Sequence, residues 1–294
     1  MDLRSYLNER TDRVNAALHR HLPGPNVRPT TLHRAMRYAV FSGGKRLRPV
    51  LCLAAAEACG GDVEDAMPAA CALELIHTYS LVHDDLPAMD DDTMRRGRAT
   101  CHVVFGEAVA VLCGDALLTT SFAALAAARP TPRHSVADMI SELARAGGSR
   151  HMIGGQMLDL EAESQPANRA ALRRIHEAKT AALLTAALRL GAMSANATPR
   201  ALDALTAFGR ALGLAFQVID DILDETATSE ELGKTAGKDA AAAKATYPAV
   251  IGLDAARREA ARLTRAAHKA LEPIARKRAA RLHEIADHLL ARKY

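Results

Sequence analysis

Residues 75–92 read LIHTYSLVHDDLPAMDDD, and residues 212–224 read LGLAFQVIDDILD. In each stretch an apolar run with helical character leads directly into a cluster of aspartates. Clustered carboxylates at the end of a buried apolar stripe are costly unless a counter-charge is supplied. Two such clusters in one chain therefore indicate a site that binds several hard divalent cations. Carboxylate oxygens without paired His or Cys ligands favour Mg²⁺ over Zn²⁺.

The remainder of the chain is predicted to be almost entirely helical, because Ala, Leu, Arg and Glu dominate and alternating strand patterns are missing. Thr30 and Thr31 are able to cap the second helix, which the glycine pair 43–44 ends. Helices are expected at about 3–22, 30–42, 48–59, 66–86, 105–128, 134–147, 150–161, 169–190, 200–224, 246–252, 254–271 and 278–292.

Two polar stretches, 87–100 and 225–245, are predicted to be loops, and a loop as long as the second is usually functional or mobile. Since no linker, repeat or change of composition divides the chain, we expect one all-α domain over residues 1–294. The segment Val109–Ala128 is apolar on most faces. It should be covered on both sides, either by a central position in the bundle or by a second subunit.

The composition narrows the class of protein. With 294 residues, 49% of them hydrophobic, the chain is able to bury a large core. A net charge of +4, 3% aromatic residues and no Trp argue against nucleic-acid binding. The five cysteines form no CxxC pair and are expected to be reduced core thiols of a cytoplasmic protein. The polar N-terminus has no apolar region of the kind found in signal peptides, and charges interrupt every apolar run, so no membrane helix is expected.

Helical spacing places His77, Ser80 and Asp84 on one face of the helix that precedes the first aspartate cluster. His77 lies two turns below the acid. Pro87 is expected to disturb the last turn, because it leaves the carbonyl of the residue four positions earlier without its helical partner. The disturbance lets Asp90 swing around instead of following the helical phase.

In the second cluster, Gln217 precedes Asp220, Asp221 and Asp224 at i+3, i+4 and i+7, so one helix face carries an amide and three carboxylates. A solvated helix end is an adequate explanation for one such cluster. It does not explain two clusters that each follow a buried stripe and have basic residues nearby.

Several basic residues accompany the clusters, as a diphosphate ligand would require. Glycines let the backbone approach an anion closely, and arginine forks grip phosphate oxygens. The basic residues lie in the run Gly43-Gly44-Lys45-Arg46-Leu47-Arg48-Pro49, in Arg95-Arg96-Gly97, at Lys179-Thr180, and at Lys234, Lys238 and Lys244. Motifs of serine hydrolases, zinc proteases, P-loop proteins and dinucleotide-binding folds are missing. This combination suggests departure of a metal-bound diphosphate from carbon, with an apolar cavity that shelters a carbocation.

These residues resemble the motifs of the trans-isoprenyl (polyprenyl) diphosphate synthase family, which carries DDxxxxD in its first half and DDxxD in its second half. The matching stretches here are Asp84–Asp90 and Asp220–Asp224. The resemblance covers roughly residues 30–294 and is closest to bacterial farnesyl diphosphate synthases. Besides the basic runs, it includes His77–His83, Gly114–Leu118, Gly154-Gly155-Gln156, Phe216-Gln217 and Lys244–Pro248.

The resemblance implies an all-α, single-domain helical bundle around a large central cavity, the isoprenoid synthase fold, assembled as a homodimer. It implies Mg²⁺ ions, about three per active site, held by the aspartates 84, 85, 90, 220 and 224 against the allylic diphosphate. The residues that it assigns to catalysis are Asp84, Asp85, Asp220, Lys179, Thr180 and Gln217, the last two facing the carbocation. Isopentenyl diphosphate would be held by Lys45, Arg48, His77 and Arg96, and the allylic diphosphate by Arg95, Lys179, Thr180, Gln217, Lys234 and Lys244; Arg292-Lys293 resembles a basic tail that closes over the site.

The implied reaction is 1'-4 condensation of isopentenyl diphosphate with dimethylallyl or geranyl diphosphate. Tyr79 and Ser80 precede Asp84 by about one helical turn and are assigned to chain-length control. An aromatic ring at Tyr79 predicts a farnesyl, C15 product, and a longer geranylgeranyl product is the first alternative. A terpene cyclase would not need the Lys45 and Arg48 site for a second diphosphate, and a non-catalytic partner subunit would have degenerate aspartate motifs.

Overall fold

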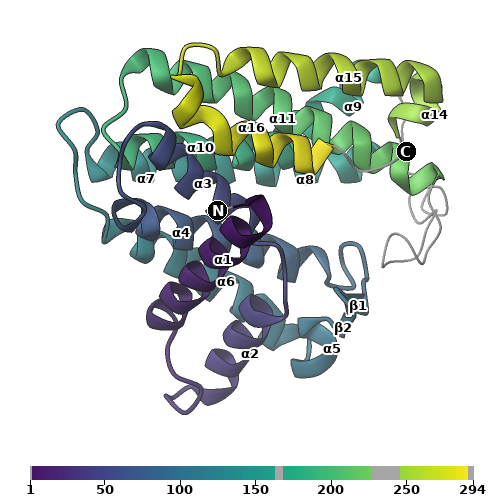
Figure 1. The fold of residues 1–294 in the computed structure, drawn as a ribbon. Helices are drawn as coiled ribbons and strands as arrows, with labels where there is room; N and C mark the ends of the chain where they lie inside the picture. The colour runs from purple at the N-terminus through teal and green to yellow at the C-terminus, as the bar shows by residue number, and fades with distance from the viewer. Residues whose placement is uncertain (1, 163–167, 227–245, 291–294) are drawn as a thin grey trace.

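The structure, a computed structural model, describes residues 2–162, 168–226 and 246–290. Within these ranges it is built almost wholly of helices (Figure 1). In chain order the elements are α1 (Leu3–His21), α2 (Thr30–Phe41), α3 (Leu47–Ala58), α4 (Val63–Asp84), β1 (Met94–Arg95), β2 (Arg98–Ala99), α5 (Cys101–Phe105), α6 (Glu107–Ala126), α7 (Val136–Gly147), α8 (Met152–Ala162), α9 (Arg169–His176), the π-helical turn η1 (Glu177–Ala181), α10 (Ala182–Ser194), α11 (Pro199–Thr226), α14 (Tyr247–Ile251), α15 (Leu253–Ala270) and α16 (Arg276–Leu290).

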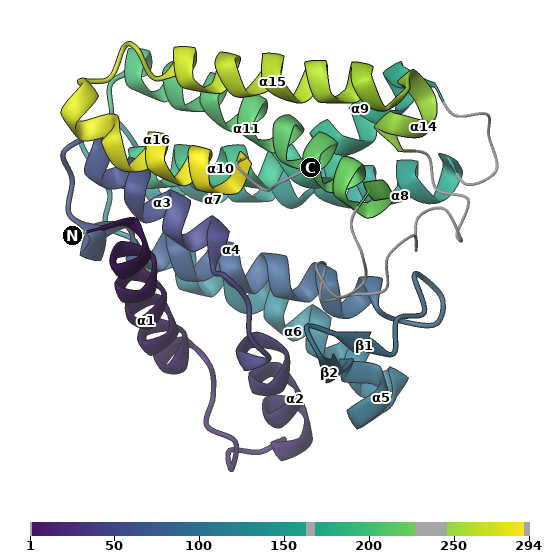
Figure 2. The ribbon, with the colours of Figure 1, turned by 45° about the vertical axis from the view of Figure 1, so that its right-hand side comes forward.

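The core of the bundle is formed by helices that are distant in the sequence. Helix α4 packs against α3, α6 and α10, and α11 packs against α10 on one side and α15 on another. Both α4 and α11 bury residues along most of their length. Figure 2 shows that the C-terminal ends of these two helices lie at the same end of the bundle. Because each aspartate cluster is at such an end, the packing brings the two clusters to one region.

The predicted all-helical character is confirmed, with one exception in the expected loop 87–100. There β1 and β2 form a short antiparallel hairpin, in which Met94 pairs with Ala99 and Arg95 with Arg98. The two residues between the strands, Arg96 and Gly97, both have positive φ angles of 54° and 73°. Positive φ at both central residues is the geometry of a type I′ turn, which matches the twist of antiparallel strands. The prediction of a loop over 87–100 was therefore wrong for the two short strands.

Three other details of the helix predictions were wrong. The helix expected over 105–128 is divided by Gly106, whose φ is 86°, into α5 and α6. The helix expected over 169–190 contains the π-helical turn η1 and continues to Ser194. Helix α2 begins at Thr30 itself, with Pro29 at the N-cap and no side-chain capping hydrogen bond, so neither threonine caps it. A proline is compatible with that position because the first amides of a helix have no partner within the helix.

Helices α6 and α11 are long and apolar enough to cross a membrane by length and composition, contrary to the expectation from their charges. The same test is passed by core helices, and 56% of the apolar window of α11 is buried inside the protein. In α6 only 39% of the window is buried, and Val111 and Leu112 are exposed. Among the described residues, the apolar segment Val109–Ala128 is therefore covered on one side only.

Candidate active site

The first aspartate cluster lies where α4 ends and the chain folds back onto it. The amide of Asp90 donates to the carbonyl of Asp84 at 2.9 Å, and the amide of Asp92 donates to the carbonyl of Asp85 at 3.2 Å. The expected swing of Asp90 is thus confirmed. The carbonyl of His83, however, keeps a partner, because it accepts from the amide of Leu86 at 3.2 Å. This tighter hydrogen bond replaces the helical one that Pro87 is unable to donate.

The second cluster lies near the C-terminal end of α11, beside η1. Gln217 accepts a hydrogen bond of 2.8 Å from the hydroxyl of Thr180, so the two residues that were assigned to the carbocation are in direct contact. Asp220 is half-buried and Asp224 is buried. The contact between Thr180 and Gln217 joins η1 to the helix turn that precedes the cluster.

The π-helical turn η1 also connects the first cluster to the rest of the site. The ammonium of Lys179 lies 2.7 Å from a carboxylate oxygen of Asp159 and 4.0 Å from one of Asp84. The side-chain amide of Gln156, on α8, donates to Asp84. A Cβ atom added at Gly155 would lie 2.3 Å from the backbone nitrogen of Lys179, so only glycine permits α8 and η1 to approach this closely. Single π-helical turns inside helices are frequent at functional sites.

The second aspartate of each cluster is held by this chain itself. Asp85 is 4% exposed, and its Oδ1 atom accepts a hydrogen bond of 2.6 Å from the Nε atom of Arg95. Burial raises the pKa of Asp85, while the hydrogen bond from Arg95 opposes that shift. Asp221 is 6% exposed and accepts a 2.9 Å hydrogen bond from the backbone amide of Tyr247. The structure therefore pairs Asp85 with Arg95, two residues that were both assigned to substrate or metal.

The residues assigned to isopentenyl diphosphate gather between the start of α3, α4 and the β1–β2 hairpin. Burial lowers the pKa of His77 well below its usual value, and the positive charges of Arg48 and Arg96 add to that effect. Burial also lowers the pKa of Arg48 to about 10, which leaves its guanidinium charged at neutral pH. Arg96 donates to the carbonyl of Gly43 at 2.5 Å, in the glycine turn that carries exposed Lys45. This region is a positively charged surface suited to a diphosphate.

The residues assigned to chain length lie one turn below the first cluster. Tyr79 is 5% exposed, and its ring contacts that of His83 edge to face with a centroid distance of 5.7 Å. The hydroxyl of Tyr79 is buried and has no hydrogen-bond partner among the described residues. Ser80 is half-buried and donates to the carbonyl of His77 at 2.8 Å. Tyr79, and not Ser80, is therefore the bulky side chain at this depth.

Some of the sequence predictions lie outside the described residues. These are Lys234, Lys238 and Lys244 in the expected loop, and Arg292 and Lys293 near the C-terminus. Conversely, Asp159 and Glu74 had no predicted role, and the structure places both in or beside the site. Gln156, quoted only as part of a motif, donates to Asp84. A signal for Asp159 was present, since it follows Gln156 by three positions and so lies on the same face of α8.

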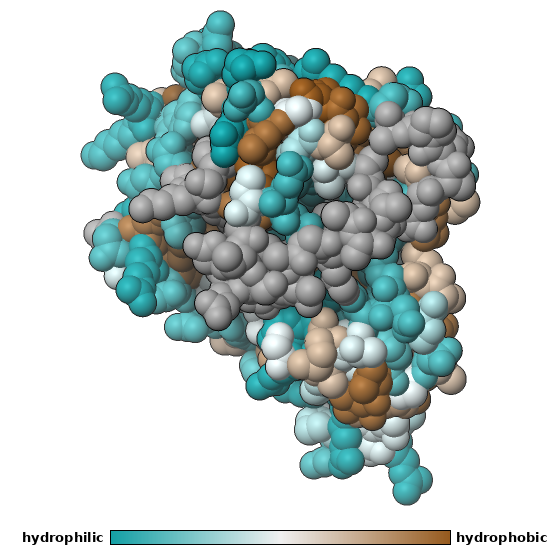
Figure 3. Space-filling view, turned by 90° about the vertical axis from the view of Figure 1, so that its right-hand side faces the viewer, coloured by the Kyte–Doolittle hydropathy of each residue, from teal (hydrophilic) through white to brown (hydrophobic). Residues whose placement is uncertain are grey.

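The donor chemistry of this region fits Mg²⁺. Asp84 of the first cluster and Asp220 and Asp224 of the second offer hard oxygen ligands. No group of three His, Cys, Asp or Glu side chains able to hold a metal by itself occurs in residues 2–162, 168–226 and 246–290. Mg²⁺ is commonly held by one or two carboxylates together with substrate phosphates, and not by an all-protein cage. The described surface at this end of the molecule carries both hydrophilic and hydrophobic patches (Figure 3).

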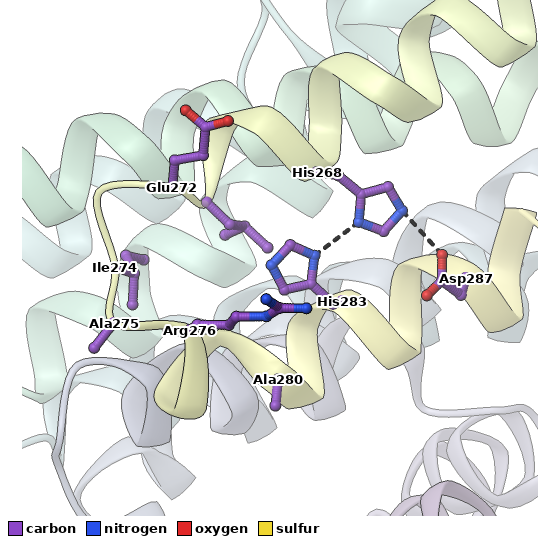
Figure 4. A pocket seen from close by; sticks show the side chains of 9 residues that line it. His268, Glu272, Ile274, Ala275, Arg276, Ala280, His283 and Asp287 are labelled. Carbon is purple, nitrogen blue, oxygen red and sulfur yellow. Dashed lines mark hydrogen bonds and ion pairs between the residues drawn. The ribbon is translucent and has the colours of Figure 1, made fainter.

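A separate cavity of about 700 Å³ lies between α15 and α16, and none of the predicted site residues lines it (Figure 4). His268 and His283 face one another there, with their Nδ1 atoms 2.7 Å apart, and Asp287 lies 2.9 Å from the Nε2 atom of His268. These three groups satisfy one another as a hydrogen-bonded chain from carboxylate to imidazole to imidazole. The cavity is therefore distinct from the aspartate region.

Comparisons with known proteins agree with this geometry. The chain is 45% identical over 295 residues to a dimethylallyltranstransferase of Fischerella ambigua, which covers 100% of this chain and 84% of that protein. It is 48% identical over 276 residues to the large subunit 1 of a heterodimeric geranylgeranyl pyrophosphate synthase of Arabidopsis thaliana, covering 92% and 74%. Among solved structures, an FPP/GFPP synthase of Zymomonas mobilis superposes with a TM-score of 0.87 at 35% identity, covering 98% of each chain.

A geranylgeranyl pyrophosphate synthetase of Pyrococcus horikoshii superposes with a TM-score of 0.91 at 29% identity, covering 99% of this chain and 98% of that one. The model of the polyprenyl synthetase family matches residues 29–284, which include both aspartate clusters and the basic turn before α3. With its isoprenoid synthase fold, the chain belongs to the polyprenyl synthetase family and is a trans-prenyltransferase.

Proposed function

We propose that this protein is a farnesyl diphosphate synthase, which condenses isopentenyl diphosphate with dimethylallyl and then geranyl diphosphate. The observation that carries the proposal is the junction at Lys179. Its ammonium lies within 4.0 Å of Asp84, and the neighbouring Thr180 contacts Gln217 beside the second cluster. One short π-helical turn thus connects the two motifs that would hold the allylic diphosphate.

Each group has a defined part in this proposal. Asp84, Asp90, Asp220 and Asp224 would hold Mg²⁺, which when bound neutralises the charge that develops on the departing diphosphate. Lys179 would bind the same diphosphate. Its ammonium is oriented by Asp159, whose carboxylate oxygen lies 2.7 Å from the Nζ atom. The Thr180 hydroxyl and the Gln217 amide oxygen would present negative ends of dipoles to the allylic cation. Asp85 would act by holding Arg95 in place, given their 2.6 Å contact.

The second substrate would be bound by the positively charged region around His77. Arg48 and Arg96 would grip isopentenyl diphosphate, with Lys45 at the exposed edge. His77, kept neutral by burial, would donate an N–H to a phosphate oxygen without adding charge. Proton loss after condensation completes the reaction, and the released diphosphate is a suitable acceptor.

Tyr79 supports the C15 product, since its buried ring lies one turn below Asp84, where a growing chain would point. A geranylgeranyl product is the second candidate, and similarity favours it. Several relatives of 44–48% identity carry the name geranylgeranyl pyrophosphate synthase, among them proteins of Arabidopsis thaliana and Capsicum annuum.

We further propose that the protein acts as a cytoplasmic homodimer. The open apolar face of α6, with Val111 and Leu112 exposed by 42% and 57%, supports a second copy as the missing cover. Light scattering of the purified protein would test this assembly. A monomer at micromolar concentration would contradict it.

Product analysis tests the proposed function. Purified protein is incubated with dimethylallyl and isopentenyl diphosphates and Mg²⁺, and the dephosphorylated products are separated by chromatography. The proposal predicts farnesol as the main product. Mainly geranylgeraniol would support the second candidate, and no elongation at all would contradict both.

A further inference from the structure

A buried ion pair lies directly beneath the proposed site for isopentenyl diphosphate. The guanidinium of Arg46 donates to Glu74 at 2.7 Å, and the two side chains are each only 3% exposed. Arg46 precedes α3, and Glu74 lies in the middle of α4. Such a pair connects the start of one core helix to the interior of another.

The remaining donors of Arg46 are also used within the protein. Its Nε atom donates to the side chain of Asn15 on α1 at 2.9 Å, and its Nη2 atom donates to the carbonyl of Val40 on α2 at 2.6 Å. The guanidinium therefore contacts three helices, α1, α2 and α4, at once. Turned inward by these contacts, Arg46 is unable to serve as a phosphate ligand, although it stands in a run of basic residues.

The backbone at Arg46 is unusual and fixes the turn that carries the phosphate-seeking side chains. Its φ of 48° lies in the left-handed region, which costs energy for a residue other than glycine and persists only when the surroundings hold it. Lys45 precedes this residue, and Arg48 follows by two positions. The directions in which both side chains leave the backbone therefore depend on the inward anchoring of Arg46.

Glu74 places its negative charge among several positive ones. It lies one helical turn before His77 on α4, and its charge acts on Arg48 and on Arg96. Guanidinium groups gathered this closely repel each other, and a buried carboxylate below them offsets part of that repulsion. The carboxylate thus serves the arginines that face the substrate as well as its direct partner.

Stability alone is a weak reason for such a pair, because well-packed apolar residues in place of a buried ion pair are often as stable or more so. We propose that the Arg46–Glu74 pair positions the residues that bind isopentenyl diphosphate without contacting the substrate itself. The pair orients the side chains of Lys45 and Arg48, and its carboxylate holds Arg48 and Arg96 close together. This inference rests on the proposed function and deepens it, since it concerns the second substrate of that same site.

The test removes both charges together, in the double variant Arg46→Met/Glu74→Leu, so that no buried charge is left unpaired. Initial rates are measured against isopentenyl diphosphate and, separately, against the allylic diphosphate. The KM for isopentenyl diphosphate is expected to rise about 10- to 100-fold, as for a misplacement of about 1 Å, with the allylic KM within about twofold of wild type. An unchanged KM for isopentenyl diphosphate in the folded variant overturns the proposal.

The matched control is Glu142→Leu/Arg189→Met, which removes a second ion pair of 3.0 Å, between α7 and α10, away from the site. It should leave both KM values unchanged, so equal KM rises in both double variants would overturn the assignment of a positioning role. If the first double variant fails to fold, Arg46→Lys replaces it. A lysine keeps the charge, but its compact ammonium lacks the planar fork whose three nitrogens reach Asn15, Glu74 and Val40. The same selective rise in the KM for isopentenyl diphosphate is therefore expected, and an unchanged KM would overturn the positioning role.

Arg48→Ala separates this inference from the proposed function. If Arg48→Ala raises the KM for isopentenyl diphosphate and the Arg46/Glu74 variants do not, only the positioning role is wrong. If Arg48→Ala also has no effect, the assignment of this region to isopentenyl diphosphate fails, and with it the positioning role.

Discussion

Replacing Tyr79 with alanine is expected to lengthen the product from C15 to C20 or beyond while the reaction continues. Tyr79 lies five residues before Asp84 on α4, and at ~1.5 Å per residue this places the ring roughly 7–8 Å below the carboxylate of Asp84. The ring is 5% exposed and held edge to face by His83. Its removal should deepen the cavity without changing any group that contacts a diphosphate.

The stability cost follows from the surroundings of the side chain. Truncating a buried aromatic residue to alanine usually costs about 3–5 kcal/mol. The buried hydroxyl of Tyr79 has no partner among the described residues, and an unsatisfied hydroxyl costs about 1–3 kcal/mol, so part of the loss is offset. A net destabilisation of about 0–4 kcal/mol is expected. The matched control Tyr79→Phe keeps the ring and loses only the hydroxyl, and should therefore be as stable as wild type or slightly more stable.

Chromatography of dephosphorylated products and thermal unfolding decide this prediction together. Wild type and Tyr79→Phe should both give mainly farnesol, and Tyr79→Ala should give geranylgeraniol or longer alcohols. An unchanged C15 profile in an active Tyr79→Ala variant would show that the floor of the cavity lies elsewhere. A longer product from Tyr79→Phe would show that the hydroxyl, and not the ring, limits chain growth.

Further predictions concern the metal, the two diphosphates and pH. Asp84→Asn or Asp220→Asn should lower kcat by about 100-fold or more with an unchanged circular dichroism spectrum, since each removes a carboxylate proposed to hold the metal at the leaving group. Near-normal turnover would contradict this. Arg48→Ala should raise the KM for isopentenyl diphosphate, and Lys179→Ala should raise the KM for the allylic substrate. Each rise should be roughly 10- to 150-fold, because a charge-assisted hydrogen bond contributes about 1.5–3 kcal/mol. Equal effects of either variant on both substrates would refute the assignment of these two residues to different diphosphates. Burial depresses the pKa of His77 in the folded state, so the unfolded chain takes up a proton first as pH falls below about 6.5, and the free energy of unfolding decreases. In denaturant titrations, His77→Gln should reduce this loss of stability between pH 7 and pH 5 by up to about 2 kcal/mol. An identical loss in the variant and in wild type would show that His77 does not contribute.

The helices and the neighbourhood of the two clusters could be predicted because apolar residues recur with the 3.6-residue period of a helix in long amphipathic segments. The stripe that ends in Asp220 on α11 is of this kind, whereas α4 is buried on most faces and is indicated by its long apolar run. The β1–β2 hairpin was missed because strands of two residues are too short to show an alternating pattern. Its turn nevertheless had a local signal in Gly97, which adopts positive φ readily.

What the sequence could not reveal depends on contacts between distant segments. The π-helical turn at Lys179 lies against the backbone of Gly155, and its close approach cannot be read from either segment alone. The same holds for Asp85, whose carboxylate was expected to face a metal but is bound by Arg95. Arg46 looked like one of several phosphate ligands, and only its partners in three helices distinguish it from Arg48.

The most direct test of prenyl transfer at the paired aspartate clusters is the rate of product formation as free divalent cation is removed. Wild-type protein is incubated with dimethylallyl and isopentenyl diphosphates, and turnover is followed with excess EDTA and again after Mg²⁺ is restored in excess over the chelator. Carboxylates and diphosphates facing one another repel without cations, so turnover should cease with EDTA and return with Mg²⁺. Undiminished formation of prenyl product in excess EDTA would contradict the assignment of the two clusters as a metal-dependent active site.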